Sequence, residues 1–150
     1  MALKALPEPA VEVNGEPVGT GADERAARQS LRILVVEDEP ATLRLMARLL
    51  RGLGHAVTTA GTIASAMEAF ETGGFDLIVS DIGLPDGTGL ELMRRAVALR
   101  GRVPSIALTG YGMEEDIVRS REAGFTAHMT KPIDFSKLEA MIRQVAPTGS

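Results

Sequence analysis

Apolar and polar residues alternate along the chain from Leu31 onward in two distinct periods. Short apolar or β-branched runs predict five strands, which cover Arg32–Val36, His55–Thr59, Phe75–Ser80, Val103–Leu108 and Thr126–Met129. Apolar residues at helical spacing predict five helices, at Pro40–Leu53, Thr62–Glu71, Thr88–Leu99 and Met113–Ala123, and from Asp134 to Val145. Strands that alternate with helices are typical of a parallel sheet covered on both faces.

The composition of the five runs predicts the order of the strands. The first, third and fourth runs are almost continuously apolar, as strands buried on both faces are. The second and fifth are shorter and more polar, which favours the two edges. We therefore expect a flavodoxin-like, doubly wound α/β fold with strand order 2-1-3-4-5. A half-barrel and half of a dinucleotide-binding fold are the alternatives. The latter needs a glycine-rich loop after the first strand, where this chain has Glu37-Asp38-Glu39-Pro40.

The helix expected at Pro40–Leu53 has one apolar stripe and a basic remainder. The apolar residues at helical spacing are Leu45, Met46, Leu49 and Leu53. The arginines Arg44, Arg48 and Arg51 lie outside this stripe.

Residues 1–30 differ in composition and in hydrophobic periodicity from the rest of the chain. They hold three of the 8 prolines and no aromatic residue, and their apolar residues keep neither period. Such a segment cannot bury enough surface to offset its ordering entropy. We expect a flexible tail or interdomain linker at 1–30, with a short helix at 23–29 as an option, a folded domain at 31–146 and a tail at 147–150.

Composition and charge exclude several classes of protein. The chain has 0 Cys and 2 His, which excludes disulfide frameworks, thiolate metal sites and histidine-rich metal sites. Its net charge of −4 argues against a nucleic-acid partner. No apolar run is long enough to span a membrane and no secretory signal is visible, so we expect a cytoplasmic protein.

The polar residues at the strand ends form the expected functional site. Glu37 and Asp38 follow the first strand, Asp81 follows the third, Thr109 the fourth and Lys131 the fifth. Ligands of open α/β sheets bind at the carboxyl ends of the strands. We therefore expect these side chains to meet in one crevice.

Three carboxylates in one crevice need compensating charge. Two like charges about 4 Å apart repel by roughly 4 kcal/mol at an effective dielectric near 20. Lys131 supplies one positive charge, and ligands that are all oxygen suit Mg²⁺ for the remainder. The chain lacks a nucleotide-binding glycine loop. A phosphoryl group is therefore expected to go onto the protein itself, with Asp81 as the nucleophile.

These segments together resemble the receiver domain of two-component response regulators. The resemblance covers residues 31 to about 146. The matching segments are Ile33–Pro40, Asp76–Gly89 (which contains the turn Pro85-Asp86-Gly87), Ile106–Gly110 and Lys131-Pro132, in the family's order and spacing. A receiver of this kind catalyses its own phosphorylation and dephosphorylation without being a conventional enzyme.

The resemblance implies a role for each site residue. Asp81 corresponds to the phosphoacceptor, and Lys131 to the lysine that pairs with the phosphoryl group, after a peptide bond to Pro132 that is expected to be cis. Asp38, Asp81 and the carbonyl of Gly83 correspond to ligands of Mg²⁺ (or Mn²⁺), with Glu37 acting mainly through water. Thr109 corresponds to the switch hydroxyl.

One position departs from the family pattern. Receivers commonly place Tyr or Phe three residues before the lysine, and here that residue is His128. An imidazole can still change its rotamer with Thr109, but it is polar and can titrate. Gly83 and Tyr111 occupy the positions that tune the lifetime of the aspartyl phosphate in the family.

The implied function is a phosphoacceptor module of a phosphorelay. Its partners would be a histidine kinase or histidine phosphotransfer domain, and a downstream protein at the face of the fourth and fifth helices and fifth strand. The source is either a free-standing regulator or, as the N-terminal segment favours, a hybrid histidine kinase. The alternatives are a receiver-like interaction module that is never phosphorylated and an Asp-nucleophile phosphatase. The phosphatase needs a second Asp two residues after the nucleophile, where this chain has Gly83.

Overall fold

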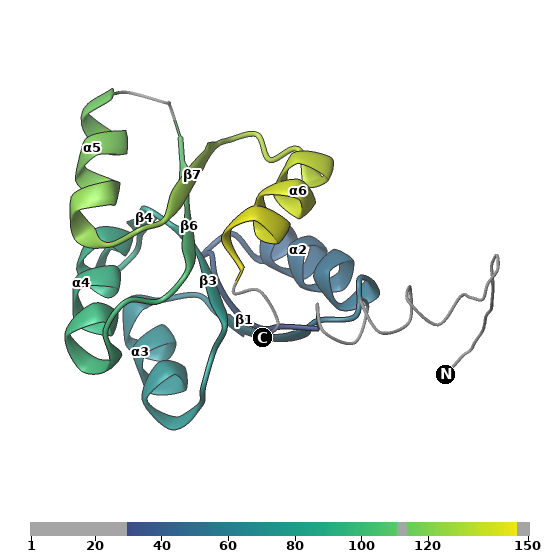
Figure 1. The fold of residues 1–150 in the computed structure, drawn as a ribbon, viewed down its shortest axis with the longest axis horizontal. Coiled ribbons are helices and arrows are strands. Elements are labelled where there is room, and N and C mark those ends of the chain that lie inside the picture. Colours follow the sequence, from purple (N-terminus) through teal and green to yellow (C-terminus); the bar gives the residue numbers. More distant parts are fainter. Residues whose placement is uncertain (1–29, 111–113, 147–150) are drawn as a thin grey trace, which may run out of the picture. The chain divides into compact units, whose positions relative to one another are not determined.

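A five-stranded parallel sheet in the order β2-β1-β3-β6-β7 forms the centre of the computed structural model, which describes residues 30–110 and 114–146 (Figure 1). The strands are β1 (Arg32–Val36), β2 (Ala56–Ala60), β3 (Leu77–Asp81), β6 (Ser105–Thr109) and β7 (Ala127–Thr130). This order is the predicted 2-1-3-4-5 arrangement, and the two polar strands lie at the edges as expected. The flavodoxin-like fold is thereby confirmed, and the half-barrel and the half dinucleotide-binding fold are excluded. The option of a helix at 23–29 and the rest of the expected tail lie outside the described residues.

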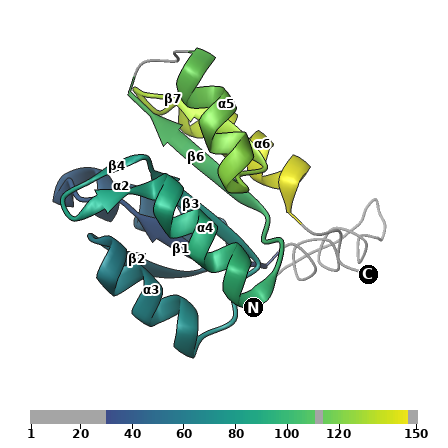
Figure 2. The ribbon, with the colours of Figure 1, turned by 90° about the vertical axis from the view of Figure 1, so that its left-hand side faces the viewer.

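Helices cover both faces of the sheet. The helices of the described residues are α2 (Pro40–Gly52), α3 (Ile63–Thr72), α4 (Gly89–Arg100), α5 (Glu114–Ala123) and α6 (Phe135–Val145). Two of them, α2 and α6, lie on one face, and α3, α4 and α5 lie together over the other (Figures 1 and 2). Within the part of the chain that the structure describes, none of these helices has the length and apolarity to cross a membrane.

Alternate residues of the central strands fill two separate cores. Leu34, Ile78 and Ala107 pack with α3 and α4, whereas Val35 and Val79 pack with α2 and α6. Each of these side chains is 0% exposed. Burial on both faces explains why these strands read as continuous apolar runs.

Polar caps set where the helices begin. Thr62 Oγ accepts a hydrogen bond from Ser65 N, and the Ser65 side chain accepts one from Thr62 N, which completes a capping box for α3. Asp134 accepts bonds from the first amides of α6, as expected. Thr88, which was expected to be the first residue of a helix, is instead the N-cap of α4.

A short antiparallel hairpin follows the third strand of the main sheet, where only a turn was expected. Its strands, β4 (Gly83–Leu84) and β5 (Gly87–Thr88), have two residues each. Strands of two residues are too short for the alternation of apolar and polar residues to repeat, so the sequence pattern shows only the turn between them. The hairpin extends directly from the carboxyl end of β3, and it is therefore part of the surroundings of the candidate site.

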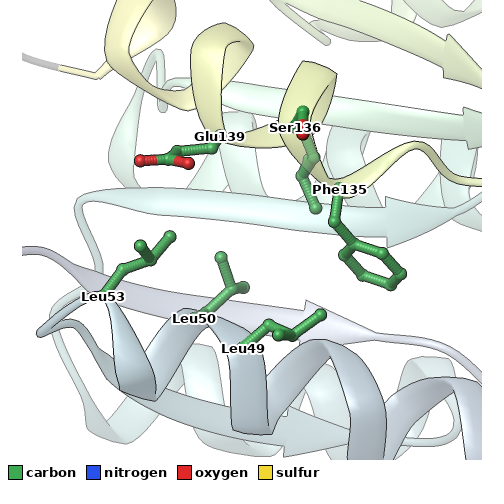
Figure 3. Close-up of a pocket in the computed structure, with 7 residues that line it drawn as sticks. Leu49, Leu50, Leu53, Phe135, Ser136 and Glu139 are labelled. Carbon is green, nitrogen blue, oxygen red and sulfur yellow. The ribbon is translucent and has the colours of Figure 1, made fainter.

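The apolar stripe of α2 divides between two environments. Met46 is buried at 0% exposure, as is its neighbour Leu50 at 2%, but the other members of the predicted stripe, Leu45, Leu49 and the C-cap residue Leu53, are 44%, 38% and 46% exposed. Leu49 and Leu53, with Leu50, point toward Phe135 and Glu139 at the start of α6 and line a shallow groove between the two helices (Figure 3). Part of the apolar stripe is thus left exposed in the described structure.

His55 lies between α2 and β2, and its surroundings predict that folding stability depends on pH. Its Nδ1 accepts a hydrogen bond of 3.1 Å from Leu31 N. Burial lowers the pKa of His55 from 6.5, partly opposed by the charge of Glu139. The unfolded chain therefore binds a proton at a higher pH than the folded protein does, and stability is lost as the pH falls below about 6.5.

We expect His55→Asn to weaken this pH dependence. Asn offers an oxygen that can accept the bond from Leu31 N but does not titrate. Urea unfolding at pH 7.5 and pH 5.5 measures the effect: the loss of stability on acidification should be smaller in the variant. An equal loss in both proteins would contradict this account of His55.

Candidate functional site

The polar residues predicted from the strand ends do meet at one edge of the sheet. Asp81 is the last residue of β3 and Thr109 the last of β6. Glu37 follows β1 directly, and Lys131 follows β7. Because β1, β3, β6 and β7 are parallel, their carboxyl ends lie at the same edge.

Three carboxylates form a tight cluster there. Oxygens of Glu37, Asp38 and Asp81 lie within 4.8 Å of one another. Glu37 is only 1% exposed and Asp81 8%, while Asp38 is exposed to solvent. Burial of two neighbouring negative charges is costly unless cations or hydrogen bonds compensate them. The site is therefore built to attract positive charge.

Local hydrogen bonds hold Glu37 in place. Its backbone N donates to Ala60 O at 3.0 Å, which ties it to β2, and its Oε2 accepts from Glu39 N at 3.0 Å. Glu39 in turn caps α2 by accepting from Thr42 N at 2.7 Å. The acidic turn after β1 is thus both the start of a helix and one wall of the site.

Lys131 bridges two of the carboxylates. Its Nζ lies 2.6 Å from Asp81 Oδ2 and 3.0 Å from Glu37 Oε1. Burial disfavours the ammonium form, but the hydrogen bonds and charges of Asp81 and Glu37 outweigh that cost and raise the pKa of Lys131. Lys131 therefore stays protonated at neutral pH. The sequence placed Lys131 near Asp81, but its contact with Glu37 was not anticipated.

Backbone carbonyls at the end of β6 hold both Lys131 and the segment that follows Asp81. Lys131 N donates to Thr109 O at 2.7 Å, and Ile82 N donates to Leu108 O at 3.0 Å. The bond between Lys131 and Pro132 is cis, as expected. The lysine and the segment after Asp81 are thus both anchored to the end of the same strand.

Thr109 and His128 lie on the same face of the sheet. His128 pairs in register with Ala107, two residues before Thr109, and side chains of strand neighbours in register share a face. The Thr109 hydroxyl is buried and donates to Met129 O at 3.5 Å. His128 is half-buried. The structure thus places the two residues expected to act as the switch on the same face of neighbouring strands.

Of the two positions linked to phosphate lifetime, one can be placed. Gly83 begins β4 and its N donates to Asp81 Oδ1 at 3.3 Å. A side chain at Gly83 would meet nothing within 4 Å, so the space beside it is open. Tyr111 lies outside the described residues.

The donor set fits a small divalent cation. It offers carboxylate oxygens from three residues, and neither of the chain's 2 histidines belongs to it. Oxygen donors with surplus negative charge suit Mg²⁺ or Mn²⁺ rather than a softer metal. Lys131 offsets only one of the three negative charges, which leaves the cluster net negative.

Fold and site together define a doubly wound α/β domain with an acidic centre at the carboxyl edge of its sheet. The model of the family described as "Response regulator receiver domain" matches residues 33–143. The chain belongs to this family.

Relatives of known sequence and structure agree with this assignment. The "Transcriptional regulatory protein TcrA" of Mycobacterium tuberculosis (strain ATCC 25618 / H37Rv) is 35% identical over 132 residues, which are 87% of this chain and 52% of TcrA. The "KDP operon transcriptional regulatory protein KdpE" of Escherichia coli (strain K12) is 35% identical over 111 residues, 74% of this chain and 49% of KdpE. The crystal structure of a CheY-like receiver domain protein from Methanospirillum hungatei JF-1 has a TM-score of 0.73 and 35% identity, and the match covers 77% of this chain and 92% of that one. The chain spans about half the length of these two transcriptional regulators.

Proposed function

We propose that this chain is the phosphoacceptor receiver of a two-component phosphorelay. Asp81 would take a phosphoryl group from a phosphohistidine of a histidine kinase or histidine phosphotransfer domain. In the transfer, a carboxylate oxygen of Asp81 bonds to phosphorus while the phosphorus–nitrogen bond of the donor breaks and the imidazole keeps the electron pair. The observation that carries the proposal is the Asp81 carboxylate held 2.6 Å from Lys131 Nζ inside the acidic cluster.

The remaining site residues have supporting roles in this proposal. Asp38, Asp81 and the carbonyl of Gly83 would hold Mg²⁺ (or Mn²⁺), with Glu37 acting mainly through water. The bound ion would offset the negative charge that accumulates on the transferring group. Lys131 would turn from Glu37 and Asp81 to the phosphoryl oxygens, and its raised pKa keeps the charge needed for that contact.

The switch would run from the site to the surface through Thr109 and His128. A phosphoryl group adds a charge near −2 at pH 7. The Thr109 hydroxyl would leave Met129 O for a phosphoryl oxygen, and His128, on the same face, would change its rotamer with it. A downstream protein would read the change at the face of α5, β7 and α6.

We propose a cytoplasmic signalling protein as the setting of this receiver, which is either free-standing or part of a longer chain. For a longer chain, the names of two matched relatives favour a transcriptional regulator, whereas the N-terminal segment favours a hybrid histidine kinase. In either setting, residues 1–30 would act as a linker and the receiver would occupy 31–146.

Incubation with acetyl phosphate tests the phosphoacceptor role. With Mg²⁺ present, intact-mass measurement should show a gain of one phosphoryl group, and peptide mapping under acidic quench should assign it to the peptide that contains Asp81. Removal of Mg²⁺ with EDTA should abolish the gain, because the negative cluster would then repel the anionic donor.

A missing adduct would have a specific follow-up. Beryllofluoride with Mg²⁺ mimics the phosphoryl group without requiring a donor reaction, and it should raise the unfolding temperature of a working receiver. Absence of both the adduct and this stabilisation would contradict the proposal and favour an interaction module that is never phosphorylated.

A further inference from the structure

Asp86 makes a long-range contact that the proposed chemistry does not use. It lies in the turn between β4 and β5, five residues after Asp81, and the sequence alone indicated only a turn there. Its Oδ1 accepts a hydrogen bond from Ile63 N at 2.8 Å, and its Oδ2 accepts one from Ala64 N at 3.1 Å. The tip of the hairpin is thereby tied to the beginning of α3, which lies 23 and 22 residues earlier in the chain.

Asp86 accepts hydrogen bonds from the two backbone amides in the first turn of α3 that the N-cap Thr62 does not bind. Thr62 Oγ1 accepts from Ser65 N at 3.0 Å, and Thr62 O accepts from Ala66 N at 3.0 Å. Ile63 and Ala64 come before these in the first turn, where backbone amides have no partner inside the helix. The bonds from these amides lower the pKa of Asp86, so its carboxylate stays charged and also matches the positive end of the helix dipole.

A second contact, between Gly87 and the side chain of Ile63, holds the hairpin close to the same helix. Gly87 has φ +151°, and a Cβ placed there would lie 2.7 Å from the Cδ1 of Ile63, which is 3% exposed. Real Cβ atoms are not found this close to another heavy atom, so the hairpin and Ile63 approach as closely as a glycine permits. The tip of the hairpin thus has both polar and apolar contacts with α3.

The other end of the hairpin reaches the phosphoacceptor. Gly83 pairs with Thr88 across the hairpin, and Gly83 N donates to Asp81 Oδ1 at 3.3 Å. Each strand has only two residues, and a two-stranded hairpin on its own is marginal in water. Ile82, before the hairpin, is held by hydrogen bonds with Leu108 O and Gly89 N. The position of Gly83, beyond this point, depends in addition on what anchors the hairpin at its tip.

We infer that Asp86 is a positioning residue, whose clamp on the first turn of α3 fixes the β4–β5 hairpin and so holds Gly83 against the acidic cluster. The inference rests on the proposed function, in which the Gly83 carbonyl is a metal ligand. Without the clamp, the hairpin would sample other positions, and the carbonyl would be in place for only part of the time. Metal affinity would fall in proportion to the time for which the carbonyl is in place, while the carboxylates would keep their positions.

The test compares Asp86→Ala and Asp86→Asn with Thr62→Ala. Asp86→Asn keeps one side-chain acceptor for the α3 amides but removes the negative charge. It provides a second, milder variant in case Asp86→Ala does not fold. Thr62→Ala is the matched control, because it removes a cap of the same helix without touching the hairpin.

Calorimetric titration of the unphosphorylated proteins with Mg²⁺ alone gives the main readout. We expect Asp86→Ala to weaken Mg²⁺ binding about 10-fold, the lower end of the range for residues that orient a ligand, and Asp86→Asn to weaken it about threefold. Thr62→Ala should bind Mg²⁺ as the unmodified protein does. The rate of phosphorylation by acetyl phosphate should fall in Asp86→Ala at low Mg²⁺ and recover at saturating Mg²⁺.

Hydrogen exchange tests the clamp without any metal. The amides of Gly83 and Thr88 should exchange faster in Asp86→Ala, but not in Thr62→Ala, since exchange reports local opening. Equal exchange and equal Mg²⁺ affinity in Asp86→Ala and the unmodified protein would overturn the inference and leave the proposed function intact. Failure of the unmodified protein to bind Mg²⁺ would overturn both.

Discussion

Replacement of Lys131 by methionine should slow phosphorylation by acetyl phosphate about 100-fold while Mg²⁺ binding is retained or strengthened. Methionine keeps an unbranched side chain of similar length but removes the ammonium group that lies 2.6 Å from Asp81 Oδ2. Loss of one positioned cation or donor that stabilises transition-state charge typically costs about 100-fold or more in rate. Mg²⁺ should bind at least as well, because the lysine no longer competes with it for Asp81 and Glu37.

The same substitution should lower stability in the absence of Mg²⁺. Glu37 is 1% exposed and would lose its 3.0 Å bond from Lys131, with a cost on the order of 2 kcal/mol for a hydrogen bond to a charged group. Added Mg²⁺ should restore part of this loss, because it binds only the folded protein. Urea unfolding with and without Mg²⁺ measures both effects.

Lys137→Met is the matched control for Lys131→Met. Lys137 lies on α6 and its side chain is exposed, so its removal changes the net charge equally without touching the cluster. Phosphorylation and stability should stay close to those of the unmodified protein. An unchanged rate in Lys131→Met, or a loss of Mg²⁺ binding in it, would contradict the role assigned to this lysine.

The convergence of the site could be predicted from the sequence because it depends on topology alone. Asp81 and Thr109 each stand at the end of a recognisable apolar run, and Lys131 follows the shorter, more polar fifth run. The polarity of the second and fifth runs was enough to place them at the edges and so to order the strands. Once the order is known, parallel strands bring their carboxyl ends together without further information.

The surroundings of the site could not be predicted, because they depend on contacts between segments with no local pattern. The carboxylate of Asp86 accepts hydrogen bonds from two amides of α3 that lie 23 and 22 residues away in the sequence. The sequence of the turn does not indicate that these amides are its partners. The division of the α2 stripe is a similar case. Leu49 and Leu53 keep the helical period of a core face, but they are 38% and 46% exposed and line the groove beside α6.

Gly89 is the position where the fold and the site depend most directly on the lack of a side chain. It is buried at the beginning of α4, and its N donates to Ile82 O at 2.6 Å. A Cβ at this position would collide with the backbone oxygen of Asp81 and would lie 3.1 Å from Ser80 Oγ. The obstacle is backbone rather than the flexible end of a side chain, so either α4 or the end of β3 must move.

We therefore expect Gly89→Ala to destabilise the protein by about 3 kcal/mol, the upper end of the usual cost of overpacking, and to lower its unfolding temperature by roughly 10 °C. Because the obstacle is the backbone of Asp81, a shift of either element changes the surroundings of the phosphoacceptor, and phosphorylation should also slow at temperatures where the variant is fully folded. Gly52→Ala is the control: Gly52 ends α2, has nothing within 4 Å of its Cβ position, and should change stability by less than about 1 kcal/mol. Thermal unfolding of both variants, followed by acetyl phosphate labelling at 15 °C, separates the two effects. A Gly89→Ala variant as stable as Gly52→Ala would mean that the close approach of α4 to the phosphoacceptor strand is not required by the fold.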